Sequence, residues 1–452
     1  MATTSHLSNI EFVLNEVIRF SQVSFEDLKT LSFEDTLSSL PHPIHQGGML
    51  ICGQQAIKKL YESAEFAIEK DRSKGRLDPE KVVRDLKQIL VDWFIAEERS
   101  LTDQMASKAV SRAIKLSKQR ALTATFLIPC HLFEGGNTTK FKIGPITFRR
   151  TERYFDRDAH EVIESANKEK EDLFKTIKEK AIKYYKSFNW IALVKLEKTD
   201  LEMGRAHAAK MVQSALDCFQ LILGTRHSYR MRVGGPNAAF DQRGTIELID
   251  SKGPQFSSSG THHDHHMPND WWLYFKEKGD DKTSHLMGLA IAEAYKYSDQ
   301  SSLSRRFLEA AAWYGEAARD KFTASRLIKF VTAIERIVTT KSEMDLTDTI
   351  AKRGAALICT RYDVKYEAVK KEIKKVYDAR SRLVHGQVSP DDTRTTSALV
   401  LTEKLSRAII IAAIGFYREA GITEKGVSLK KIDREYNSVV SIIEKRSKEA
   451  VK

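Results

Sequence analysis

The last third of the chain constrains the fold most, because one helical pattern follows another there. From residue 301 onward apolar residues recur every three or four positions, and no segment shows the alternation that is typical of a strand. Gly386 and Gly421 stand where helices should end, and Ser389-Pro390 followed by two acids is typical of a helix start. The pattern predicts helices at 302–318, 321–340, 345–360, 363–384, 391–419 and 431–450.

The first 300 residues mix helix and strand patterns. Apolar spacing predicts helices at 53–70, 78–98, 101–119, 158–187 and 203–222, with a loop at 41–48 and a polar loop at 251–284. Strand-forming residues predict a hairpin of 121–133 with 139–150, and further strands at 190–198, 227–233 and 244–250. We therefore predict an α+β, predominantly helical chain. Its parts would be a helical region (1–120), a mixed α/β region (121–300) and an all-α helical domain (301–452).

The chain is basic, and the excess of positive charge lies in the helical third. The formal net charge is +12, and the isoelectric point is near 9.2. Residues 301–452 hold 30 Lys and Arg against 20 Asp and Glu. Such a balance suits a polyanionic partner such as RNA, although it does not require one.

Cysteine usage and hydropathy predict a reducing compartment and no membrane partner. The cysteines are widely scattered and form no C-x-x-C pair. The N-terminus lacks the basic and apolar segments of a signal peptide. The longest apolar stretch, 408–417, is far shorter than the ~18–20 residues that a membrane helix needs. We expect a cytoplasmic protein.

One short motif lies in the predicted helix 363–384. Arg380 and His385 form the only R-x4-H pair of the chain, directly before Gly386. In a structural interpretation the arginine lies on the surface and the histidine interacts with the last carbonyls of the helix. In a catalytic interpretation the pair cleaves RNA without a metal, because RNA carries its own nucleophile in the 2′-hydroxyl. That reaction needs a proton-exchanging group such as histidine and a cation such as arginine at the phosphoryl oxygens.

The spacing of the pair sets a geometric condition for catalysis. On a regular helix, positions 380 and 385 lie ~140° apart, whereas Ser381 and His385 share a face. Arg380 must therefore curl its side chain round to reach His385, or the helix must loosen at its end.

Residues 301–420 resemble the HEPN superfamily, compact all-α domains that carry R-x4-6-H at a helix end. They are most similar to the ApeA-like HEPN proteins of bacterial abortive infection, which combine a variable front half with the patterns "AIE" and "R-x-x-L-V-H-G". In this chain the patterns are Ala333-Ile334-Glu335 and Arg380 to Gly386. Active members commonly have Asn, Asp or His after the motif arginine, and this chain has Ser381.

The resemblance implies an endoribonuclease that needs no metal or cofactor and acts on RNA, tRNA included, in anti-phage defence. His385 would be the general acid/base and Arg380 the transition-state cation, with Ser381 and Glu335 as supports. Cleavage would leave a 2′,3′-cyclic phosphate and a 5′-hydroxyl. The resemblance also implies a homodimer with two motifs at one cleft. The front region would then sense a phage-derived trigger or restrain the nuclease.

Two alternatives remain open at the motif. Ser381 favours a catalytically inactive HEPN scaffold that binds RNA, nucleotide or a protein partner. Glu335 either orients Arg380 or serves only as a structural partner for an arginine of the bundle.

Other stretches have competing interpretations. Arg226, Arg230 and Arg232 around an aromatic residue suit a single-stranded RNA path, although the solvated face of a strand explains them better. Arg382 suits a phosphate contact or a solvated helix face. The histidines and aspartate at 262–266 are good ligand types, but their spacing argues against an ordered metal site, and we predict none. No Walker A, G-x-G-x-x-G, G-x-S-x-G or paired-carboxylate motif is present, which excludes most NTPases and hydrolases of those kinds.

Overall fold

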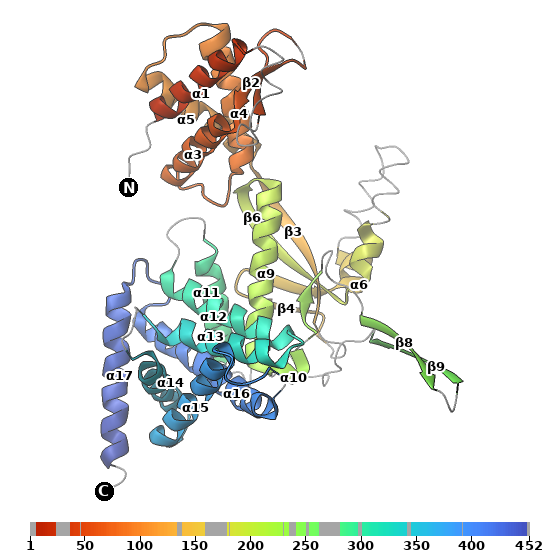
Figure 1. The fold of residues 1–452 in the computed structure, drawn as a ribbon, viewed down its shortest axis with the longest axis vertical. Helices are drawn as coiled ribbons and strands as arrows, with labels where there is room; N and C mark the ends of the chain where they lie inside the picture. Colours follow the sequence, from red (N-terminus) through yellow and green to blue (C-terminus); the bar gives the residue numbers. More distant parts are fainter. Residues whose placement is uncertain are drawn as a thin grey trace. The chain divides into compact units, whose positions relative to one another are not determined.

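A computed structural model describes most of the chain (Figure 1). The described residues are 6–23, 37–45, 47–132, 138–158, 179, 181–228, 230–234, 241–249, 253–261, 281–296, 301–340, 345–390 and 392–449. The chain forms two compact units, residues 1–125 with 195–207 and residues 126–194 with 208–452. The predicted boundary at 120 lies close to the first crossing between these units, whereas residue 300 lies inside the larger one.

The smaller unit packs helices and a short hairpin around one core. Its described elements are α1 (His6–Ser21), β1 (Leu37–Pro41), β2 (Met49–Gly53), α3 (Gln54–Lys70), α4 (Pro79–Leu90), the π-helical continuation η1 (Val91–Ala96) and α5 (Asp103–Arg120). The start of α4 is as predicted, because Asp78 accepts a hydrogen bond from the Glu80 N–H at 3.0 Å and Pro79 takes the first helical position. The predicted loop at 41–48 connects β1 to β2, which pair antiparallel.

Most of a five-stranded sheet belongs to the larger unit, and its hairpin differs from the predicted one. The strand order is β4 (Lys140–Ile143), β5 (Ile146–Arg150), β6 (Trp190–Thr199), β3 (Leu122–His131) and β7 (Arg232–Val233). Residues 121–133 were predicted to pair with 139–150, but β3 lies between β6 and β7 instead. The tight turn lies inside the second segment, where Gly144 takes a φ of +53° between β4 and β5. A Cβ at Gly144 would collide with the Gly288 carbonyl of α11 (Asp281–Ala294).

A second hairpin replaces residues 253–261 of the predicted polar loop at 251–284, and residues 262–280 of that loop lie outside the described residues. Strand β8 (Asp241–Ile249), which covers the predicted strand at 244–250, pairs antiparallel with β9 (Gly253–Thr261). The glycine and serine residues of β9 have weak strand propensity, so its pairing with β8 determines its conformation.

The described part of residues 301–449 is entirely helical, as predicted. Its helices are α12 (Ser302–Arg319), α13 (Thr323–Val338), α14 (Leu346–Arg361), α15 (Tyr366–Val384), α16 (Thr393–Ala420) and α17 (Leu429–Glu449). Helix α16 starts later than predicted, because Asp392 rather than Ser389 caps it by accepting from the Arg394 N–H at 2.8 Å. Gly386 and Gly421 end α15 and α16 with positive φ, as predicted. No described helix is long and apolar enough to cross a membrane.

A buried ion pair joins this bundle to α9 (Leu201–Leu223). Arg319 of α12 donates to Asp217 of α9 at 2.9 Å and to Gln220 at 2.7 Å, and Gln213 also donates to Asp217, at 3.0 Å. Burial raises the pKa of Asp217 to about 6, although Arg319 opposes the shift. A carboxyl group in an unfolded chain titrates near pH ~3.9.

Asp217 is expected to stabilise the fold less as the pH rises. The folded chain holds the Asp217 proton more tightly than the unfolded chain, so its contribution is fully present below pH ~4 and is lost as the pH passes about 6. Relative to Asp217→Asn, the wild type should lose on the order of 2–3 kcal/mol of unfolding free energy between pH ~4 and ~7. Urea denaturation of both proteins at each pH measures the difference, and parallel pH profiles would contradict the prediction.

Candidate active site

The motif lies where α15 ends beside α13, and a glycine determines how the helix stops. Gly386 takes a φ of +69°, which favours glycine. The Gln387 N–H donates to the Arg382 carbonyl at 2.8 Å, and the Gly386 N–H donates to the Leu383 carbonyl at 3.2 Å. These two bonds form a Schellman motif, which satisfies carbonyls at the end of the helix. The stop places His385 at the C-cap, the last position before the chain turns away.

His385 is exposed at this helix end. Its backbone N–H donates to the Ser381 carbonyl at 3.0 Å, so the helical hydrogen bonding reaches the motif histidine. Within the described ranges, the imidazole has no hydrogen bond or ion pair, and the residue is classed among the exposed ones. The imidazole is therefore not tied to a protein partner in the described structure.

Arg380 lies against α13 rather than in solvent. Its Nη2 is 3.9 Å from Glu335 Oε1, and the two side chains are 26% and 20% exposed. The Arg380 Nε is buried and has no hydrogen-bond partner among the described residues. The guanidinium is thus held near a carboxylate, and the exposed 26% of the side chain is the part at which it can meet an oxyanion. The partial burial of Glu335 agrees with both interpretations of this residue, so both remain open.

Tyr377 also belongs to this cluster, although it is not part of the R-x4-H motif. The guanidinium carbon of Arg380 lies 5.9 Å from the centroid of the Tyr377 ring. Burial raises the pKa of Tyr377, and the charge of Glu335 and a side-chain hydrogen bond to it raise that pKa further. The sequence holds a signal for it, because a residue three positions before Arg380 lies on the same helix face.

The structure does not bring all the motif residues into contact. Helix α15 remains regular through Val384, so Arg380 faces Glu335 while His385 occupies the exposed helix end. No described hydrogen bond or ion pair joins the Arg380 and His385 side chains. Ser381 is half-buried, and Arg382 lies 3.8 Å from Asp378, one turn earlier on the same helix.

The predicted strand at 227–233 is a strand only at Arg232–Val233 (β7), and residues 227–228 belong to a helical turn instead. Residues Thr225–Ser228 form α10, which includes Arg226, and Arg232 lies in the two-residue β7. Arg230 lies in the turn between them, so the three arginines do not alternate along one strand. The cause is tertiary: Glu403 of α16 accepts hydrogen bonds from the N–H of Thr225 at 3.3 Å and from its hydroxyl at 2.7 Å, which caps α10.

The side chains of these three arginines have different environments. That of Arg226 lies outside the described residues. Arg230 and Arg232 are half-buried, and the Nε of Arg232 is buried without a hydrogen-bond partner among the described residues.

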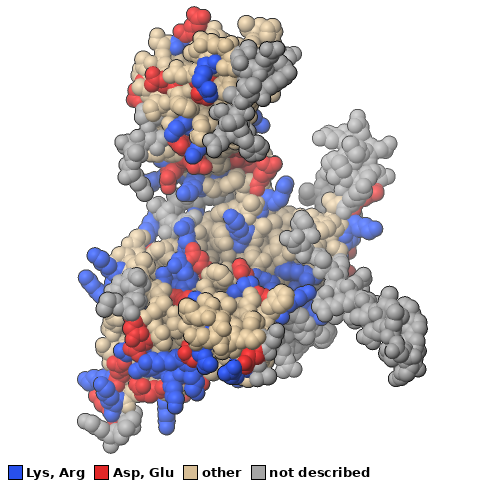
Figure 2. Space-filling view, in the orientation of Figure 1, with Lys and Arg blue, Asp and Glu red and all other residues tan. Residues whose placement is uncertain are grey.

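Basic side chains gather over α15 at the lower end of the larger unit, with acidic ones among them (Figure 2). Lys374 pairs with Asp348 at 2.6 Å, and Lys375 pairs with Glu372 at 2.6 Å. The Lys375–Glu372 pair is exposed and contributes little to stability, whereas Lys352 and Lys374 together lower the pKa of Asp348 to about 2.

The smaller unit contains a cluster of three carboxylates, and one lysine partly neutralises it. Ligand oxygens of Asp78, Asp200 and Glu202 lie within 4.8 Å of one another. The Lys81 ammonium lies 2.6 Å from Asp200 and 3.7 Å from Glu202. The predicted ligand types at 262–266 lie outside the described residues.

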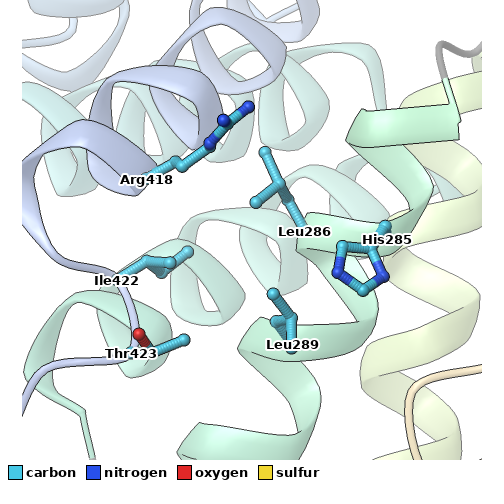
Figure 3. A pocket seen from close by; sticks show the side chains of 6 residues that line it. All are labelled: His285, Leu286, Leu289, Arg418, Ile422 and Thr423. Carbon is cyan, nitrogen blue, oxygen red and sulfur yellow. The ribbon is translucent and has the colours of Figure 1, made fainter.

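A shallow pocket of about 390 Å³ lies between α11 and the end of α16 (Figure 3). His285, Leu286 and Leu289 line it from α11, and Arg418, Ile422 and Thr423 line it from the other side. None of these residues is among the predicted site residues.

Known proteins do not test the resemblance of residues 301–420 to the HEPN superfamily. No protein-family model matches the chain, and no curated protein or solved structure matches it. The resemblance therefore rests on the residues around Glu335 and Arg380 and on the all-helical fold that carries them.

Proposed function

We propose that the protein is a metal-independent endoribonuclease of the HEPN type that acts in bacterial anti-phage abortive infection. One observation supports the proposal most: Arg380 is held 3.9 Å from Glu335 while its buried Nε has no partner in the described structure. A cation restrained in this way suits the charge that develops on phosphoryl oxygens. The exposed His385 supplies a proton-exchanging group five residues later.

The chemistry follows from RNA itself. The 2′-hydroxyl loses its proton to a base and attacks the neighbouring phosphorus, and the bond from phosphorus to the 5′-oxygen breaks. The leaving 5′-oxygen takes up a proton. The products are a 2′,3′-cyclic phosphate and a 5′-hydroxyl, and Arg380 stabilises the negative charge on the phosphoryl oxygens in between.

The proposal includes a homodimer, because one copy makes an incomplete site. A single His385 can remove one proton or deliver one, and it does not contact the Arg380 of its own chain in the described structure. A second copy facing the same cleft would supply both roles from two histidines and two arginines. Arg382, Arg226, Arg230 and Arg232 would contact RNA phosphates outside the cleft.

The front region would regulate this nuclease in the cytoplasm. An unrestrained ribonuclease would harm its host, so we propose that residues 1–300 restrain the site until a phage-derived trigger is sensed.

Cleavage of RNA in the presence of EDTA tests the proposal. Purified protein should cut tRNA or total RNA with and without EDTA, and leave 2′,3′-cyclic phosphate ends. Arg380→Ala should lower the rate by about 10²–10³-fold, the usual effect of removing one oxyanion-stabilising donor. Arg382→Ala is the matched control, and we expect it to weaken RNA binding with little change in the rate at saturating RNA.

The same assay tests the rival functions. Cleavage that EDTA abolishes would indicate a metal centre instead. RNA binding without turnover would indicate an inactive scaffold, which the departure at Ser381 favours.

A further inference from the structure

We propose that Tyr377 is a positioning residue, which holds the Arg380 guanidinium and the Glu335 carboxylate in one arrangement for phosphate binding. The inference extends the proposed function, because it names a residue through which Arg380 acts. Tyr377 lies one helical turn before Arg380 on α15, and the arginine lies over its ring at 5.9 Å from the centroid. A cation within ~6 Å of an aromatic centroid is attracted by the ring.

The hydroxyl of Tyr377 restrains Glu335, the carboxylate that faces Arg380. Glu335 of α13 interacts with this phenol and also lies 3.9 Å from Arg380 Nη2. The phenol keeps its proton at neutral pH, because burial and the Glu335 charge both raise the pKa of Tyr377. It can therefore remain a donor to the carboxylate while the carboxylate faces the guanidinium.

Contacts with the Tyr377 ring and with Glu335 together determine the orientation of the planar Arg380 guanidinium. The ring supports Arg380 from one side, and Glu335 attracts its Nη2 end. The Nε remains buried and without a partner among the described residues. The guanidinium is thus held on two sides, and the 26% of the Arg380 side chain that is exposed is where a phosphate oxygen would contact it.

The fold does not need the Tyr377 hydroxyl for its core. Ile373 and Val376 make the buried contacts of this part of α15 and are 1% and 2% exposed, whereas Tyr377 is half-buried. Tyr377→Phe keeps the ring and its packing and removes only the hydroxyl, whose pKa the Glu335 charge raises. Tyr377→Leu also removes the aromatic face.

Kinetics of the Tyr377 variants, in the wild type and in Arg380→Ala, distinguish positioning from a general structural role. Tyr377→Phe should lower kcat about 2–10-fold with little change in KM, the loss expected for one hydrogen bond. Tyr377→Leu should lower it further. In the Arg380→Ala background neither Tyr377 substitution should change kcat, because the residue through which Tyr377 acts is gone. Tyr362→Phe, a tyrosine change in the turn before α15, is the matched control. An equal loss in both backgrounds would overturn the inference.

A second readout does not depend on cleavage. Arginine-selective ¹⁵N labelling reports rotation about the Nε–Cζ bond of Arg380, with the signal assigned by Arg380→Lys. Rotation should become faster in Tyr377→Phe and stay unchanged in Tyr362→Phe. If the wild type does not cut RNA, the proposed function fails, but the rotation rate still decides the role of Tyr377. No change of that rate in Tyr377→Phe would refute the inference.

Discussion

His385→Ala is expected to lower the rate of RNA cleavage by about 10²–10⁴-fold, the range found for a general acid or base. The same change should leave the stability of the fold within about 0.5 kcal/mol, as is usual for a surface substitution. The reason is structural, because the His385 imidazole is exposed and makes no hydrogen bond or ion pair in the described part of the chain. Initial rates on one RNA substrate and thermal unfolding of the same samples measure both effects.

His285→Ala provides the control for this prediction. His285 is also an exposed histidine of the larger unit, but it lies at the pocket between α11 and α16. Its replacement should change neither the rate nor the unfolding midpoint. Full activity in His385→Ala would show that this imidazole transfers no proton in the reaction.

Asp433→Ala is expected to have the largest effect on stability, about 3–5 kcal/mol of unfolding free energy. Arg353 of α14 is only 5% exposed, and its Nη2 lies 2.6 Å from Asp433 Oδ1 of α17. The Arg353 Nη1 also donates to the Val338 carbonyl at 3.0 Å, at the end of α13. Removal of the carboxylate takes the Asp433 partner away from a buried positive charge, and such a loss is costly in a low-dielectric interior.

A paired comparison isolates the role of burial in this prediction. Glu372→Ala removes a carboxylate that pairs with Lys375 at the same 2.6 Å, but those side chains are 37% and 56% exposed. Its cost should be at most about 1 kcal/mol. The loss of unfolding free energy in Asp433→Asn should lie between the losses in Asp433→Ala and Glu372→Ala, since the amide oxygen still accepts a hydrogen bond from Arg353. Equal shifts in the urea midpoint for Asp433→Ala and Glu372→Ala would show that burial does not set the cost.

The predicted helices of the last third agree with the structure to within a few residues. Apolar spacing reports which face a helix buries, and Gly386 and Gly421 mark ends because positive φ favours glycine. The start of α16 shows the limit of such signals. Ser389, Asp391 and Asp392 are all good caps, and the turn in which the Asp392 N–H donates to the Ser389 carbonyl at 3.1 Å makes Asp392 the cap.

The strands were harder to predict, because pairing between distant segments forms them. Residues 121–133 had the correct strand propensity but were assigned the wrong neighbour, since nothing local encodes that β3 pairs with β7, about 100 residues later. The predicted strand at 227–233 is shortened to Arg232–Val233, and residues 227–228 belong to α10, whose first residue, Thr225, is hydrogen-bonded to Glu403, 178 positions away. Contacts of this range outweigh local propensity.

The motif pair was visible in the sequence, whereas its surroundings were not. The residue patterns and their resemblance to the HEPN superfamily selected Arg380, His385 and Glu335, and Gly386 marked the end of the helix. Only the tertiary structure placed Glu335 of α13 beside Arg380, added Tyr377 to that contact and left His385 exposed. The physical reason is that periodicity and capping are local properties of the chain. The neighbour that a side chain meets across two packed helices depends instead on how every other helix of the bundle is buried.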